Sequence, residues 1–168
     1  LAVASEVFPL VKTGGLADVV GALPDALQAH GVTSRVLVPG YPAVMAALKT
    51  PETIHTYATL FGGPASLVAA KAAGLSVIAL DAPHLFNRPG NPYLGPDGKD
   101  WPDNAARFAA LCRAAADFGE GRVAAFVPDI VHSHDWQAAL AAVYLAFAKG
   151  RRAASLLTVH NLAFQGTF

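Results

Sequence analysis

The sequence predicts an α/β fold in which a mostly parallel sheet carries helices on both faces. Short apolar segments alternate along the chain with segments whose apolar residues recur at helical spacing. Several of the predicted strands are continuously apolar, which is typical of strands buried on both faces of a sheet. The length of 168 residues is enough for one domain with a substantial core.

The first 49 residues predict two strands and two helices. Residues 1–5 begin with four apolar residues, and in residues 35–38 three apolar residues follow Arg35, so both segments are expected to be strands. Apolar residues at helical spacing predict a helix over 16–27, which Pro24 should kink or restart and Gly31 should end. Pro42 suits the first position of a short helix that is expected to reach residue 49.

The middle of the chain predicts a meander and then a long loop. Residues 54–60, 65–72 and 75–80 are expected to be strands, and the short glycine-bearing turns between them favour antiparallel pairing. Residues 87–104 hold four prolines and three glycines. A loop of this length inside a compact domain is usually functional or mobile.

The last third predicts two helices and two strands. Asp103 is expected to cap a helix whose apolar face includes Cys112, which places that cysteine in the core. A strand over 129–132, a helix over 136–149 ended by Gly150, and a strand over 154–159 are expected to follow. The chain starts at Leu1 and stops at Phe168 in a predicted loop, so we expect an incomplete domain.

Composition excludes several classes of function. Twelve basic and twelve acidic residues give a net charge of zero, without the basic excess typical of proteins that bind nucleic acid or anionic membranes. One cysteine cannot form an intrachain disulfide, which favours a reducing compartment. No apolar run is long enough to span a bilayer, and the N-terminus lacks the basic region of a signal peptide. We therefore expect a cytoplasmic protein.

Polar residues follow the first predicted strand, at the start of the first predicted helix. Gly14 and Gly15 would let backbone N–H groups approach an anion, the helix start adds partial positive charge, and Lys12 adds a full cation. The pattern matches neither a Walker A loop nor a dinucleotide fingerprint. The segment is either a phosphate site or a tight turn beside a solvated lysine.

Two further polar clusters follow later strands. Asp135 could cap the helix that begins at Trp136, and His132 with His134 could be a metal-ligand pair or contact a sugar. His160 and Asn161 follow the last predicted strand, where a lone histidine is either a structural group or a ligand contact. Because ligands bind beyond the carboxyl ends of parallel strands, we expect all three clusters to meet at one edge of the sheet.

These clusters, in this order, resemble the bacterial and plant glycogen (starch) synthase family. The likeness covers essentially the whole chain. The matching segments are Ser5-Glu6, residues 12–19 (Lys-Thr-Gly-Gly-Leu-Ala-Asp-Val), residues 134–136 (His-Asp-Trp) and residues 158–166 (Thr-Val-His-Asn-Leu-Ala-Phe-Gln-Gly), with Pro39-Gly40-Tyr41-Pro42 and Pro92-Tyr93 also in expected places.

The resemblance implies a GT-B glycosyltransferase, in which two Rossmann-like domains face each other across a cleft. Residues 1–168 would be most of the N-terminal, acceptor-side domain, and the C-terminal domain would lie outside this sequence. The implied reaction transfers glucose from ADP-glucose to the non-reducing end of an α-1,4-glucan such as glycogen, with retention. It implies no metal and no cofactor, and no nucleic acid or membrane as a partner.

The resemblance also assigns roles to individual residues. It implies that Lys12, Gly14 and Gly15 meet the donor phosphate and that Asp18 lies near the sugar or the acceptor. For the transferred glucose, it implies that His160 steadies the reacting centre, that Asn161 supports that placement and that Asp135 is needed for activity. Tyr93 would contact the acceptor or the glucose.

The chain departs from the family at Gln137, where many relatives carry a histidine; both side chains donate hydrogen bonds. The family's catalytic glutamate and its further phosphate-binding cations lie outside this sequence, so we expect this segment to be inactive alone. Two other readings stay open: a metal-dependent hydrolase using His132, His134 and His160, or a non-catalytic glucan-binding fragment. The sequence does not discriminate ADP-glucose from UDP-glucose.

Overall fold

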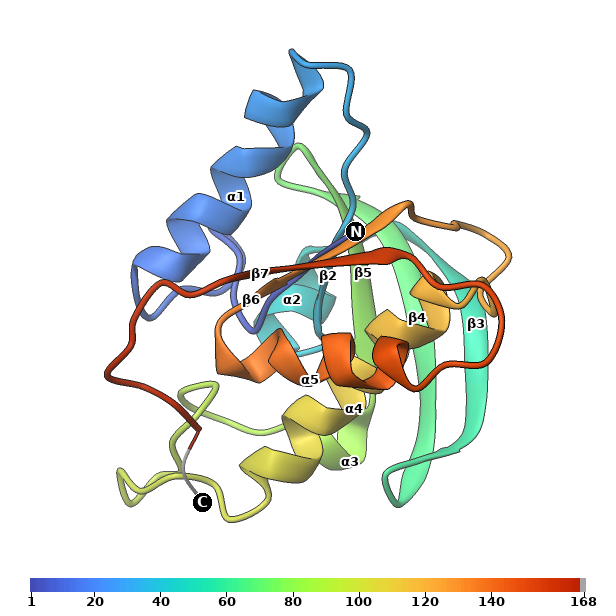
Figure 1. Ribbon diagram of the computed structural model, residues 1–168. Helices are drawn as coiled ribbons and strands as arrows, with labels where there is room; N and C mark the ends of the chain where they lie inside the picture. The colour runs from blue at the N-terminus through green and yellow to red at the C-terminus, as the bar shows by residue number, and fades with distance from the viewer. Residues whose placement is uncertain (167–168) are drawn as a thin grey trace.

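The computed structural model describes residues 1–166; Phe168, where the predicted terminal loop stops, lies outside the described residues. Its centre is one seven-stranded sheet with the order β3-β4-β5-β2-β1-β6-β7 (Figure 1). The strands are β1 (Ala2–Val3), β2 (Val36–Pro39), β3 (Lys49–Leu60), β4 (Gly63–Ala72), β5 (Leu75–Asp81), β6 (Ile130–His134) and β7 (Ala154–Thr158). The helices are α1 (Gly15–Gln28), α2 (Pro42–Ala47), α3 (Pro83–Phe86), α4 (Asn104–Gly119) and α5 (Trp136–Ala146).

The sheet is parallel from β5 through β2, β1 and β6 to β7, and antiparallel where β3 and β4 extend it. This confirms the mostly parallel sheet and the antiparallel meander. The strands β1, β6 and β7 therefore have their carboxyl ends at one edge, and each is followed by one of the three polar clusters. The strand order alone brings these clusters together.

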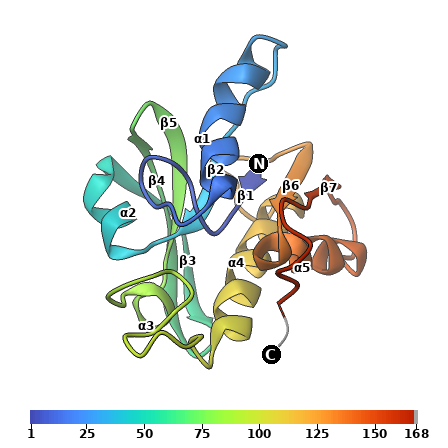
Figure 2. The ribbon, with the colours of Figure 1, turned by 90° about the vertical axis from the view of Figure 1, so that its left-hand side faces the viewer.

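Helices cover both faces of the sheet, as expected. The connection from β1 to β2 through α1 runs across the sheet in the opposite direction to the connection from β6 to β7 through α5, so right-handed crossovers place the two helices on opposite faces. Figure 2 shows α4 and α5 together on one side of the sheet and α2 on the other. Cys112 of α4 is 1% exposed, which confirms its place in the core.

Several element boundaries differ from those expected. The helix α2 ends at Ala47 because the chain enters β3 at Lys49, and β3 pairs with β4 over a longer stretch than its apolar pattern indicates. The strand β6 runs two residues further than expected, to His134, because it pairs with β7 as far as Thr158. The helix α1 continues through Pro24 without interruption, and Gly31 follows it with φ of +77°.

Asp103 does not cap α4 with its side chain, contrary to expectation. Its carboxylate instead accepts hydrogen bonds from the Arg88 guanidinium, the first of them 2.7 Å from Arg88 Nη1 to Oδ1. The Arg88 guanidinium also lies over the Trp101 ring, 4.8 Å from its centroid. These contacts join the two ends of the long loop between α3 and α4.

A buried arginine at the start of α4 holds the same loop from inside. Arg107 is 1% exposed, and its guanidinium donates to Leu85 O at 2.8 Å, Pro92 O at 2.9 Å and Asn104 Oδ1 at 2.7 Å. Burial lowers the pKa of this guanidinium. Fixed hydrogen-bond acceptors on three segments thus replace the water that the cation loses on burial.

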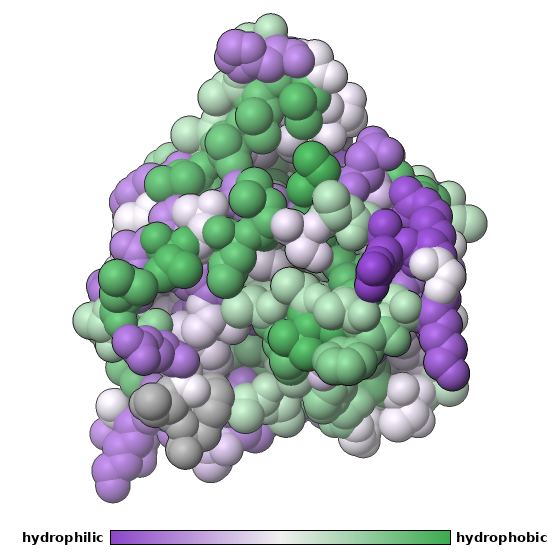
Figure 3. Space-filling model, viewed as in Figure 1, coloured by the Kyte–Doolittle hydropathy of each residue, from purple (hydrophilic) through white to green (hydrophobic). Residues whose placement is uncertain are grey.

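One edge of the sheet carries exposed apolar side chains. In β7, Leu156 is 50% exposed and Leu157 45% exposed, and Phe147 after α5 is 84% exposed. Figure 3 shows hydrophobic residues at the surface around β7 and α5. Within residues 1–166, no helix is long and apolar enough to cross a membrane.

We predict that Arg107→Met lowers the free energy of unfolding by about 3–5 kcal/mol, because it leaves two buried carbonyl oxygens and the Asn104 amide without their donor. Urea unfolding followed by circular dichroism measures the change. Arg152→Met, which replaces an exposed arginine, is the matched control and should change stability by less than about 0.5 kcal/mol. Equal losses in the two variants would contradict the anchoring role of Arg107.

Candidate active site

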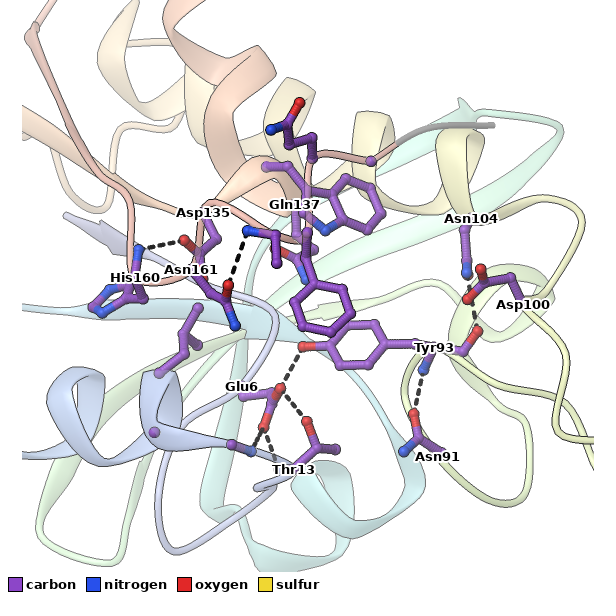
Figure 4. Close-up of a pocket in the computed structure, with 18 of the residues that line it drawn as sticks. Glu6, Thr13, Asn91, Tyr93, Asp100, Asn104, Asp135, Gln137, His160 and Asn161 are labelled. Carbon is purple, nitrogen blue, oxygen red and sulfur yellow. Dashed lines mark hydrogen bonds between the residues drawn. The ribbon is translucent and has the colours of Figure 1, made fainter.

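A pocket of about 820 Å³ opens at the carboxyl edge of the sheet, where the three polar clusters meet. Figure 4 shows side chains from the loop after β1, from the α3–α4 loop, from the start of α5 and from the segment after β7 around one space. The lining residues are Glu6, Thr13, Gly14, Gly15, Leu16, Val19, Asn91, Tyr93, Leu94, Asp100, Asn104, Asp135, Trp136, Gln137, His160, Asn161, Ala163, Phe164, Gln165 and Gly166.

The carboxylate of Glu6 organises the side of the pocket next to α1. Glu6 is 2% exposed and follows the short strand β1. It accepts hydrogen bonds from the Thr13 hydroxyl at 2.6 Å, from the Thr13 N–H, and from the Gly14 N–H at 3.4 Å (Figure 4). The Gly14 N–H therefore already faces an anion, and that anion belongs to the protein.

Tyr93 connects the α3–α4 loop to the same carboxylate. Its hydroxyl donates to Glu6 and lies 2.8 Å from the Ser5 hydroxyl. Burial, and then the neighbouring Glu6 carboxylate, raise the pKa of Tyr93 well above its usual value. The Tyr93 carbonyl accepts from Asn104 at 2.9 Å, and its N–H donates to Asn91 at 2.8 Å. Tyr93 thus lines the pocket with a ring whose polar end is fully engaged.

Nothing in the fold requires glycine at positions 14 and 15. A Cβ atom added at either position would meet no other atom of residues 1–166 within 4 Å. Gly14 has φ of −147° and ψ of −169°, which any residue adopts. The missing side chains instead leave open space in the pocket at the start of α1, where first-turn N–H groups have no partner within the helix.

Lys12 and Asp18, both expected at the site, do not line the pocket. They pair with each other: Lys12 Nζ lies 2.7 Å from both carboxylate oxygens of Asp18. Their side chains are 44% and 52% exposed. They flank the glycine loop on the same segment, so the lysine remains near the pocket without facing into it.

Asp135 does not cap α5 with its side chain, so the capping interpretation is wrong. Its Oδ1 instead accepts a hydrogen bond of 2.6 Å from the backbone N–H of His160 (Figure 4). Asp135 has φ of +56° and ψ of −175°, a conformation that glycine normally occupies and that costs a non-glycine residue about 1–3 kcal/mol. Backbone strain at Asp135 therefore accompanies a contact that holds His160.

The three histidines of this edge lie in a row. The rings of His132 and His134 have centroids 4.1 Å apart, and His134 Nδ1 lies 3.0 Å from His160 Nε2. His132 Nε2 lies 2.7 Å from the Thr158 hydroxyl. Burial, and then the neighbouring His132 and His160, lower the pKa of His134 to about 3.

The histidine row does not form a metal site in the described part of the chain. Within residues 1–166, no three His, Cys, Asp or Glu side chains are grouped so that they could hold a metal ion. Hydrogen bonds between His134 and His160, and between His132 and Thr158, engage one ring nitrogen of each histidine.

The remaining wall comes from the segments after β7 and at the start of α5. Asn161 Oδ1 accepts from the Ala163 N–H at 2.9 Å, and Figure 4 shows its amide end pointing toward Glu6. Gln137, where the sequence departs from the family, is 7% exposed, and its Oε1 has no hydrogen-bond partner within the described residues. Gly166 approaches the Trp136 ring so closely that an added Cβ would lie 2.6 Å from it.

The structure thus brings six of the eight expected site residues into one pocket: Gly14, Gly15, Tyr93, Asp135, His160 and Asn161. Sequence reasoning missed Glu6 as a site residue, together with Thr13, Asn91 and Asn104. The available signal for Glu6 was its position: an acidic residue directly after a buried strand and just before the glycine loop.

Comparison with known proteins agrees with this geometry. The family model described as "Starch synthase catalytic domain" matches residues 1–168. The glycogen synthase of Rhodopseudomonas palustris (strain BisB18) is 62% identical over 168 residues, which is 100% of this chain and 34% of that protein. "Glycogen synthase 2" of Bradyrhizobium diazoefficiens is 60% identical over 100% of this chain and 35% of its own length.

Among solved structures, the chain is similar to the catalytic domain of Starch Synthase IV from Arabidopsis thaliana bound to ADP and acarbose. The TM-score is 0.79 at 29% sequence identity, and the match covers 98% of this chain and 34% of that chain. The chain therefore spans about one third of the length of the curated relatives it matches.

Because the pKa of His134 is about 3 in the folded protein and 6.5 in its unperturbed state, the unfolded chain takes up this proton first as pH falls. We therefore predict that stability decreases from about pH 6.5 downward. His134→Asn removes this group, so the slope of the free energy of unfolding against pH should fall by up to about 1.4 kcal/mol per pH unit, the value for one proton. Urea unfolding of both proteins between pH 8 and pH 4 measures it; parallel curves would contradict the prediction.

Proposed function

The chain belongs to the starch synthase catalytic domain family, and from this premise we propose that it forms part of the active site of a retaining glycosyltransferase. The proposed reaction transfers glucose from ADP-glucose to the non-reducing end of an α-1,4-glucan. The observation that carries the proposal is one pocket lined both by the glycine-bearing start of α1 and by the His160–Asn161 segment. The Arabidopsis relative, bound to ADP and acarbose, supports a nucleotide and a sugar in this pocket.

The start of α1 is suited to the leaving diphosphate. The helix N-terminus carries about half a positive charge, and such a charge stabilises the anion that develops as the glycosidic bond to phosphate breaks. Glu6 already occupies the Gly14 N–H, so the N–H of Gly15 is the first donor that a phosphate oxygen would meet. The open space at both glycines lets a phosphate approach the backbone.

Lys12 adds a full positive charge by exchanging its partner. Its ion pair with Asp18 is exposed, and pairs of this kind contribute about 0–1 kcal/mol. Replacement of Asp18 by a donor phosphate therefore costs little. The released Asp18 carboxylate would then be available to sugar or acceptor hydroxyls, which is the role expected from the sequence.

The segment after β7 is suited to the transferred glucose. His160 would offer its main-chain carbonyl to the reacting sugar, where an oxocarbenium-like centre gains positive charge, and Asp135 fixes the backbone of His160 for this task. The Asn161 amide would bond to sugar hydroxyls. The Tyr93 ring would pack against glucose or acceptor, since its hydroxyl is occupied by Glu6.

The proposed reaction needs residues that this chain does not contain. A second domain across the cleft would supply the further phosphate-binding cations and the catalytic glutamate that the family resemblance implies. Closure of both halves would exclude water, which strengthens every electrostatic contact in the site. We propose that the reaction uses no resident metal or cofactor, because the helix start, Lys12 and the cations of the second domain would meet the leaving-group charge. We also propose that glycogen is the acceptor.

We predict that residues 1–168, exchanged for the matching segment of the 62% identical Rhodopseudomonas palustris synthase, give a chimera that transfers labelled glucose from ADP-glucose to glycogen. The chain alone should show no transfer. Parallel assays with UDP-glucose determine the donor, and NMR of the new linkage determines retention. A folded chimera that binds glycogen but transfers no glucose from either donor would favour the non-catalytic glucan-binding alternative.

Gly15→Ala in this chimera should raise KM for ADP-glucose roughly tenfold or more, because the added methyl group displaces the donor phosphate from the helix start. The temperature of thermal unfolding should be unchanged or higher, because the methyl group meets no atom of the described residues and alanine favours a helix. Gln28→Ala, on the exposed far end of α1, is the control and should leave KM unchanged. An unaltered KM in Gly15→Ala would contradict the phosphate role.

A further inference from the structure

The proposed function assigns no task to His134, the most deeply buried of the three histidines. Its side chain is fully buried at the end of β6. Its Nδ1 lies 3.0 Å from His160 Nε2, and the two rings stack with centroids 5.3 Å apart and planes 23° from parallel. Its other nitrogen, Nε2, is buried and has no hydrogen-bond partner among residues 1–166.

A histidine is a costly residue for this position if packing is its only task. An apolar side chain of similar size would fill the space and leave no buried polar atom unpaired. The low pKa of His134 keeps its ring neutral. One of the two facing nitrogens, His134 Nδ1 or His160 Nε2, therefore donates the hydrogen bond and the other accepts it. In the described part of the chain, the one hydrogen bond that the His134 ring makes is the bond to His160.

His160 is also held by Asp135, the residue that follows His134 in the chain. Asp135 accepts the backbone N–H of His160, while His134 bonds to its ring. The last ladder pair of β6 and β7 joins His134 to Thr158, and the Asp135 N–H donates to Thr158 O at 2.9 Å. Two contacts, one to the main chain and one to the ring, fix both the position of residue 160 and the rotation of its side chain.

We infer that His134 is a positioning residue for glucosyl transfer, acting through the ring of His160. The inference rests on the proposed function, since it assumes that His160 lies against the transferred sugar. Figure 4 shows the His160 ring on the side away from Tyr93, with its backbone toward Asp135. The ring thus serves as an anchor, and the backbone of residues 160 and 161 is what it presents to the pocket.

Three substitutions of His134 in the chimera separate positioning from packing. Asparagine places a polar atom near the position of Nδ1 and can donate or accept there, glutamine places it near Nε2, and leucine only fills space. We expect His134→Gln and His134→Leu to lower kcat by roughly 10- to 100-fold with KM for ADP-glucose within about threefold, because a displaced reacting group costs rate more than binding. His134→Asn should retain most of the kcat of the unsubstituted chimera.

The activities and thermal stabilities of the three variants distinguish a positioning role of His134 from a packing role. Full activity in His134→Leu, or equal loss in all three variants together with lower thermal stability, would show that His134 only packs the core. His84→Asn, which changes a histidine bonded to the Leu60 carbonyl outside the pocket, is the control and should leave kcat unchanged.

If the unsubstituted chimera transfers no glucose, the proposed function fails. NMR of ¹⁵N-labelled histidines then tests only whether His134 holds the His160 ring. The His160 ring signals should change in the leucine variant and be retained in the asparagine variant; unchanged signals in both would overturn the inference.

Discussion

The pocket depends on one buried carboxylate. Glu6 accepts hydrogen bonds from the glycine loop and from Tyr93, and so joins the end of β1, the start of α1 and the α3–α4 loop. An ionised carboxylate at 2% exposure is stable only when several donors replace its hydration. The N–H groups before a helix are the donors best placed to do so. The Glu6 carboxylate therefore fixes the conformation of the glycine loop, and the donors of that loop offset the cost of burying the carboxylate.

The opposite wall is fixed by two contacts to His160. Consecutive residues at the end of β6 hold His160 by its ring and by its backbone N–H. Because β6 and β7 are parallel neighbours, this arrangement requires no segment from elsewhere in the chain. One wall is thus organised around the Glu6 carboxylate beside a helix start, and the other around a neutral imidazole and the Asp135 carboxylate.

The sequence predicted the mostly parallel sheet, the meander and the meeting of three polar clusters, because strand order and polarity at strand ends depend on local patterns. It placed Asp103 and Asp135 wrongly as helix caps, because the same side chains have better partners in Arg88 and in the His160 N–H. It also missed Glu6 as a site residue. Partners 15 and 25 positions away decide the two aspartate cases, and no local pattern records them, whereas Glu6 did have a local signal in its position before the glycine loop.

The strained backbone at Asp135 also constrains how this site can vary during evolution. Its φ of +56° favours glycine, whereas the bond to His160 requires an acceptor that glycine lacks. Among common replacements, asparagine alone combines tolerance of positive φ with a side-chain oxygen at the same distance from the backbone. Relief of the backbone strain would favour glycine here, while retention of the bond to the His160 N–H would oppose it. Position 135 is therefore a place where the two pressures act on a single codon in opposite directions.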